Sequence, residues 1–174
     1  NLYEKIVRAK FSYDFNEIES MHLSRNANSE YKEFNIVRDG DVIIDGGSFD
    51  GTTAFDLMKA AGTDNPKTQI HSFDASLTHV KSEYKHEKIK YQEKALYDRD
   101  CKLTFHSYPG IEAAGSFVQT LAPHEVLSEM SENIVNAISI DNYRRSEKIE
   151  KIDYIKLDVE GSEAAVIRGA FETI

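Results

Sequence analysis

The sequence predicts an α/β domain with a mainly parallel sheet and helices on both of its faces. Three observations predict this fold. Short apolar runs rich in β-branched residues alternate with helical patterns in the order βαβαβ, short strands, then βα. The first run leads into a glycine-rich turn, DGGSFDG, that opens a helix. Three runs end in an aspartate, at Asp45, Asp74 and Asp158, and the carboxyl ends of parallel strands share one edge of a sheet.

The parallel strands are predicted from four apolar runs, at residues 41–45, 69–74, 89–94 and 153–158. Between the third and fourth runs the pattern is less regular, with strands expected at 102–107 and 135–140, a loop at 108–115 and a short strand at 116–119. Helices are predicted at 52–61, from Ser76 with Leu77, Val80 and Tyr84 on one face, and from Ser162.

The chain is predicted to consist of two segments. Residues 1–38 are predicted to form an N-terminal helical cover, because Leu2, Ile6 and Ala9 share one helical face. Asp14 and Glu17 have the spacing of a capping box, with Asp in place of Ser or Thr. Residues 39–174 are predicted to form the α/β domain, which is long enough to bury a sizeable core.

Composition excludes several classes of function. The net charge is −9, from 30 acidic and 21 basic residues, which argues against a nucleic-acid partner because such proteins carry a basic face. No apolar run is long enough for a membrane span. The single cysteine, Cys101, excludes an internal disulfide and a cysteine-cluster metal site. A cytoplasmic location is expected, and oligomeric state is left open.

The turn after residues 41–45 fails two nucleotide-binding patterns. A Walker A loop requires GxxxxGK[ST], but Thr52 stands where the phosphate-contacting lysine belongs. A dinucleotide loop requires GxGxxG, and Ser48 or Phe49 occupies the second glycine position in the two possible frames. The sequence therefore disfavours both a nucleotide triphosphatase and an NAD or FAD site.

A third pattern fits, in which an acidic residue ends a strand and x-G-x-x-x-G follows. Asp45, Gly47 and Gly51 satisfy it. This pattern suits S-adenosylmethionine, because a carboxylate can bind its ammonium group. The N–H groups that are free at a helix N-terminus would receive its carboxylate. The alternative is that the loop is only a tight strand-to-helix turn.

Two downstream carboxylates favour the cofactor site. Asp74 would lie beside the first turn at the carboxyl edge of the sheet, where it can accept both ribose hydroxyls. Asp158 would lie near the point where ligands bind in such sheets. The alternatives are a charge at a helix N-terminus for Asp74 and a helix cap for Asp158.

From about residue 36 to its end the sequence resembles the FkbM-type methyltransferase family. The resemblance rests on VIIDGGSFDGTT, IHSFDAS, KALYDRDCKLTFHS and above all IDYIKLDVEGSEAAVIRGA. It implies a Rossmann-like methyltransferase sandwich that uses S-adenosylmethionine. It also implies a small-molecule or saccharide acceptor, because the family commonly O-methylates sugars, polysaccharides or natural products. The family's sheet continues with further strands after the last of these stretches, so the C-terminal strands are expected to be missing beyond Ile174.

The resemblance also implies the site residues. Asp158, Glu160, Gly161 and Glu163 match the DxEGxE signature, and Ala75 stands where the family more often has Pro. The expected cofactor-binding residues are Asp45, Gly46, Gly47, Ser48, Gly51, Thr53, Asp74, Ala75, Ala95, Leu96 and Asp158.

Methyl transfer to a hydroxyl needs a general base in addition to positioning. The catalytic candidates are Asp158, Glu160 and His106, and an alternative for the two carboxylates is a divalent metal ion. No metal is assigned. Four other histidines lack ligand spacing and are expected at the surface, namely His71, His79, His86 and His124.

Overall fold

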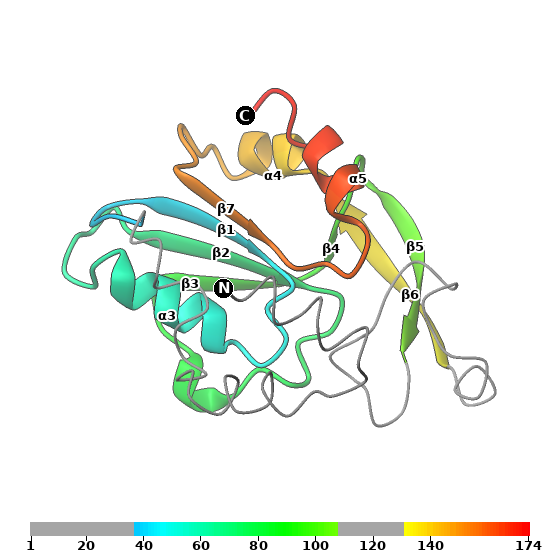
Figure 1. Cartoon of the computed structure of the whole chain (residues 1–174), viewed down its shortest axis with the longest axis horizontal. Coiled ribbons are helices and arrows are strands. Elements are labelled where there is room, and N and C mark those ends of the chain that lie inside the picture. The colour runs from blue at the N-terminus through cyan, green and yellow to red at the C-terminus, as the bar shows by residue number, and fades with distance from the viewer. Residues whose placement is uncertain (1–36, 108–130) are drawn as a thin grey trace, which may run out of the picture. The chain divides into compact units, whose positions relative to one another are not determined.

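The computed structural model describes residues 37–107 and 131–174 (Figure 1). These residues belong to one unit, residues 37–174. The helical cover predicted for residues 1–38 falls almost wholly outside the described residues. The loop predicted at 108–115 and the strand predicted at 116–119 lie outside them as well.

The predicted parallel sheet is present. Its four strands are β1 (Val42–Gly46), β2 (Gln69–Asp74), β3 (Ile89–Glu93) and β7 (Tyr154–Leu157). They lie in the order β3-β2-β1-β7, and every neighbouring pair is parallel. Asp45 is opposite Ser72 on one side and Lys156 on the other. The strands therefore end together, and the loops that follow them meet at one edge.

Helices cover both faces of this sheet, as predicted (Figure 1). Helix α3 (Thr52–Ala60) packs Leu57 and Met58 against Ile43 and Ile70 on one face. Helices α4 (Ile140–Ser146) and α5 (Glu163–Arg168) bury residues against Ile44 on the other. Neighbouring residues of a strand point to opposite faces, so Ile43 and Ile44 belong to different clusters. None of the helices within the described ranges is long and apolar enough to cross a membrane.

A second sheet lies beside the first and was not predicted as such. It has the order β4-β6-β5, formed by β4 (Ala95–Leu96), β5 (Cys101–Ser107) and β6 (Ser131–Ile138). Ala95 and Leu96 directly follow the run predicted as the third parallel strand, and they pair with Ala137 and Ile138 of β6. Strand β6 also ends earlier than predicted, because Ser139 accepts a hydrogen bond from Asn142 N–H and caps α4, a helix that the sequence analysis missed.

The prediction of an α-helix that begins at Ser76 is wrong. Only the short 3₁₀-helix η2 (Ser82–Tyr84) forms between β2 and β3. The Ser76 N–H donates to Asp74 Oδ1 (3.1 Å), and the Ser76 hydroxyl bonds with that of Thr78 (2.9 Å). Lys81 then ties the segment to the glycine turn, through its N–H to Asp50 O and its ammonium to the Asp50 carboxylate. The local bonds of Ser76 and the longer-range bonds of Lys81 together replace the ones that a helix would have made.

His71 was expected at the surface and is instead fully buried. Its Nδ1 lies 2.8 Å from the Tyr143 hydroxyl, between the central strand β2 and helix α4. Burial lowers the pKa of His71 to about 4, and the nearby Lys90 ammonium acts in the same direction. The ring is therefore neutral at pH 7 in the folded protein.

This burial predicts a pH-dependent stability. Between pH 6.5 and about 4 the unfolded His71 binds a proton and the folded one does not, so stability falls as the pH falls through this window. We expect a loss of about 3 kcal/mol over the window. Urea unfolding at pH 7 and pH 4.5 would measure it. In His71→Phe this part of the pH dependence should vanish, and an unchanged dependence would contradict the assignment.

Candidate functional site

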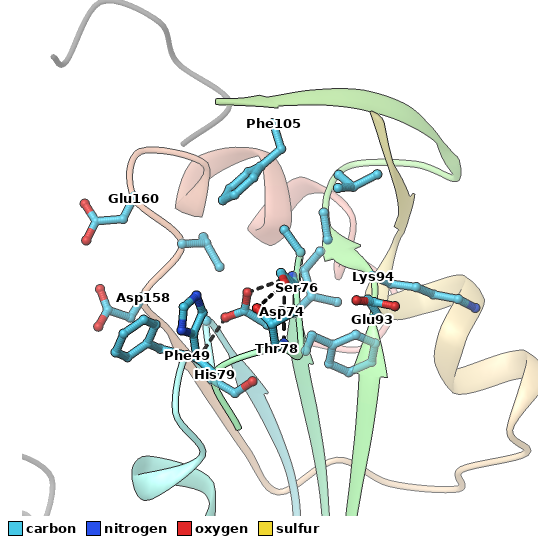
Figure 2. Close-up of a pocket in the computed structure, with 18 of the residues that line it drawn as sticks. Phe49, Asp74, Ser76, Thr78, His79, Glu93, Lys94, Phe105, Asp158 and Glu160 are labelled. Carbon is cyan, nitrogen blue, oxygen red and sulfur yellow. Dashed lines mark hydrogen bonds between the residues drawn. The ribbon is translucent and has the colours of Figure 1, made fainter. Parts of the chain in front are cut away.

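A cleft of about 760 Å³ opens at the carboxyl edge of the parallel sheet. The loops after β1, β2, β3 and β7 line it, together with residues of the second sheet (Figure 2). Phe49, Asp158 and Glu160 lie toward one end, and Glu93 and Lys94 lie toward the other (Figure 2). This is the edge at which α/β folds bind ligands.

The glycine turn is pressed against the loop after β7. Gly47 has a φ of 78°, and a Cβ added there would lie 1.9 Å from the Asp158 carbonyl oxygen. Only glycine fits this position, for both backbone and steric reasons. The register explains the closeness, because Asp158 N–H donates to Gly46 O (3.0 Å) directly beside the turn.

The N–H groups of this turn are already used within the chain. Those of Gly47 and Ser48 donate to Phe73 O, and that of Phe49 donates to Asp74 Oδ2 (2.8 Å). The N–H of Gly51 donates to Ser48 O, and that of Thr52 to Asp50 Oδ1. The expectation that free N–H groups at this helix start receive a carboxylate is therefore not met by these five residues.

Ser48 has a buried polar atom that points to a ligand. The residue is 3% exposed and lines the cleft. Its hydroxyl has no hydrogen-bond partner among the described residues. Because buried polar atoms are normally paired, this hydroxyl fits a polar group of a bound molecule.

Asp74 lies at the end of β2, inside the cleft. One carboxylate oxygen accepts the Phe49 N–H and the other accepts the Ser76 N–H. These bonds fix the carboxylate and leave each oxygen able to accept another hydrogen bond. Beside it, the Phe49 ring stacks on His79 at a centroid distance of 5.2 Å, and Phe49 has a φ of 43°. Neither aromatic residue was among the predicted site residues.

Asp45 is placed behind the turn and is not among the cleft-lining residues. It is fully buried, and its carboxylate accepts a hydrogen bond from the Ser72 hydroxyl (2.7 Å). Its other oxygen lies 3.2 Å from Lys156 Nζ. Burial raises the pKa of the Asp45 carboxyl, whereas the Lys156 ammonium and the Ser72 hydrogen bond oppose that rise. Lys156 was not among the predicted site residues, although it is the one charged residue inside the strand sequence YIKL.

The DxEGxE signature shapes the opposite rim. Asp158 and Glu160 are exposed and line the cleft. Glu160 has a φ of 47°, and the Glu163 carboxylate accepts the N–H groups of Val159 and Gly161. Glu163 thus holds the strained turn that presents the two exposed carboxylates. Among the described residues no group of three or more His, Cys, Asp or Glu side chains is arranged to hold a metal ion.

His106 lies outside the cleft lining. It is 8% exposed, and its Nδ1 is 3.6 Å from the Glu132 carboxylate. Its neighbour Phe105 lines the cleft instead, because adjacent residues of β5 point to opposite faces. Gly46 and Gly51 are also absent from the lining. The cleft brings together nine of the predicted residues, namely Gly47, Ser48, Thr53, Asp74, Ala75, Ala95, Leu96, Asp158 and Glu160.

Two comparisons with known proteins both find a methyltransferase FkbM. The sequence model of the methyltransferase FkbM domain matches residues 45–174. Among solved structures, the crystal structure of a methyltransferase FkbM from Methylobacillus flagellatus KT is similar to the chain, with a TM-score of 0.54 and 13% sequence identity. The similarity covers 86% of this chain and 34% of that one, and at this identity it shows the fold alone. No curated protein matched the sequence.

Proposed function

The chain belongs to the FkbM methyltransferase family, and from this premise we propose that its cleft binds S-adenosylmethionine and serves methyl transfer to a hydroxyl group. The acceptor we propose is a sugar, a polysaccharide or a natural product. One observation carries the proposal most directly. The Asp74 carboxylate stands in the cleft at the end of β2, held by two backbone N–H groups and able to accept two hydroxyls.

The residues present fit this cofactor. The unpartnered Ser48 hydroxyl can bind a polar group of its amino-acid end, and Asp74 with Ala75 would hold the ribose. Ala95 and Leu96, buried where β4 borders the cleft, would lie against the adenine. Gly47 and Thr53 complete this set at the turn. Asp45, Gly46 and Gly51 support the turn from outside the lining.

The chain's own residues would orient the acceptor and take its proton. When bound, the cofactor supplies a methyl group on a positively charged sulfur. Asp158 and Glu160 are exposed carboxylates of the cleft and are our candidates for the base, since proton removal requires a group that reaches the hydroxyl. His106 was a third candidate, and its place outside the lining favours the carboxylates over it.

The charge of the cleft favours an acceptor that is not an anion. Five carboxylate side chains line it, those of Asp50, Asp74, Glu93, Asp158 and Glu160. Against them stand Lys94 and the Lys156 ammonium, which lies beside Asp45. An acceptor with a carboxylate or phosphate near Asp158 would be repelled. A cytoplasmic location and the absence of a nucleic-acid partner stay predictions.

Binding measurements test the cofactor proposal. We expect S-adenosylhomocysteine to raise the melting temperature of the 174-residue chain and to bind in calorimetry, whereas NAD should do neither. Stabilisation by a ligand that binds only the folded state follows from mass action. Stabilisation by NAD and not by the homocysteine derivative would overturn the proposal in favour of an oxidoreductase.

The second candidate is a binding module with the same fold and no turnover. Radiolabelled S-adenosylmethionine with a panel of neutral glycosides separates the two. Label transfer that disappears in Asp158→Asn with Glu160→Gln supports the enzyme. Cofactor binding without transfer to any glycoside in the panel supports the module.

A further inference from the structure

A buried lysine in the strand next to β1 contacts the glycine turn. Lys156, in β7, is 4% exposed. Its ammonium lies 2.8 Å from Gly47 O, 3.2 Å from Gly46 O and 3.2 Å from Asp45 Oδ1. A lysine ammonium has three N–H donors, and these three oxygens all belong to the end of β1 and the turn after it.

Stability alone is a weak reason for this arrangement. Removing two charges from water costs free energy that their attraction repays only in part, and neutral packing residues often serve as well. Lys156 also stands among apolar neighbours, Ile155 and Leu157, that pack in the core. The ammonium does, however, fix the orientation of two carbonyl groups, those of Gly46 and Gly47.

The orientation of these two carbonyls matters because both belong to glycine residues. Glycine adopts many backbone conformations, so consecutive glycines do not fix a turn by themselves. With both carbonyls turned toward Lys156, the next N–H, that of Ser48, points to Phe73 O (3.2 Å). This leaves the Ser48 residue against the cleft and Gly47 against Asp158 O.

We propose that Lys156 is a positioning residue of the cofactor site, whose ammonium holds the Gly46 and Gly47 carbonyls and thereby sets the shape of the turn that borders the cleft. Asp45 is the counter-ion of Lys156 and does not itself touch the ligand. This inference rests on the proposed function, because the turn is the part of the site that would meet the cofactor.

The single variant Lys156→Met does not separate this role from a structural one, and three other variants of the 174-residue chain do. Lys156→Met alone leaves the buried Asp45 carboxylate without its cation, which risks unfolding. The neutral double variant, Asp45→Asn with Lys156→Met, removes both charges and keeps the side-chain shapes. Asp45→Asn alone keeps the lysine and its bonds to the carbonyls, and because it leaves the buried ammonium without its counter-ion, its stability is measured alongside its binding. Ile70→Ala, at the opposite end of β2, lowers stability without touching the cleft.

Calorimetry with S-adenosylhomocysteine is the readout. We expect the double variant to bind about tenfold more weakly or worse, because hydrogen bonds to a charged donor are lost. Asp45→Asn should lose no more than about threefold, because Lys156 keeps its bonds to the Gly46 and Gly47 carbonyls. Ile70→Ala should bind normally at a melting temperature lowered as far as that of the double variant.

The outcomes are distinct. Unaltered binding by the double variant would overturn the role of Lys156 while leaving the cofactor proposal intact. An equal loss in Asp45→Asn and the double variant would also overturn it, because the carboxylate would then be the active group. Weakened binding in Ile70→Ala would mean that any loss of stability weakens binding, and it would also overturn the role of Lys156. If the unchanged protein does not bind the probe, the cofactor proposal itself fails.

Discussion

Gly47→Ala is expected to destabilise the protein by about 3 kcal/mol and to abolish S-adenosylhomocysteine binding. The added methyl would lie 1.9 Å from the Asp158 carbonyl oxygen, a distance that no side chain can tolerate. Asp158 cannot simply move away, because its N–H donates to Gly46 O and Leu157 pairs with Gly46 across the sheet. Alanine would also be held at a φ of 78°, which L-residues adopt at a cost.

The control for this variant is Gly40→Ala. Gly40 has a similar φ of 89°, but the nearest atom to an added Cβ is the side-chain amide of Asn65, which can rotate. We expect a loss of about 1 kcal/mol and normal ligand binding. Urea unfolding and calorimetry measure both variants. Equal losses in the two would mean that the backbone conformation matters and the contact with Asp158 does not.

Asp74→Ala is expected to weaken S-adenosylhomocysteine binding by about 100-fold, the value of two hydrogen bonds to a charged acceptor. The substitution also removes the acceptor of the Phe49 and Ser76 N–H groups, so the rim of the cleft loses its support. Asp74→Asn should lose less, since one oxygen remains. Calorimetry with the three proteins gives the comparison.

Asp153→Ala is the matched control for Asp74. The Asp153 carboxylate also accepts a backbone N–H, that of Val42 (3.1 Å), but it lies at the opposite end of the sheet. We expect this variant to bind the ligand normally at a modestly lower stability. If Asp74→Ala bound the ligand as well as the unchanged protein does, the ribose role of Asp74 would be wrong.

The fold was largely predictable because its signals are local. Four apolar runs identified all four parallel strands, three of these runs ending in Asp45, Asp74 and Asp158, and the helix after the glycine turn followed from its pattern. The failures have a common cause. The helix expected from Ser76 is replaced by local bonds of Ser76 and by the contact of Lys81 with Asp50, which is distant in sequence. The second sheet was missed because its strand pairs are also distant in sequence.

The sequence predicted which loops form the candidate site. It was less successful in predicting which side chains face the cleft. Spacing placed Gly47, Ser48, Asp74 and Asp158 at one edge, and the structure brings them into one cleft. The spacing of residues along the chain does not tell which face of a strand borders the cleft. For this reason His106 was chosen and Phe105 was not, although they are adjacent.

By itself, the sequence determined the parallel α/β sheet, the glycine turn and the family, because these depend on patterns and residue types along the chain. Only the tertiary structure decided which charges meet. It paired Asp45 with Lys156 behind the turn, buried His71 against Tyr143, and left Asp74 and Asp158 in the cleft. The physical reason is that burial and charge pairing depend on neighbours from other strands, which the register of the sheet brings together.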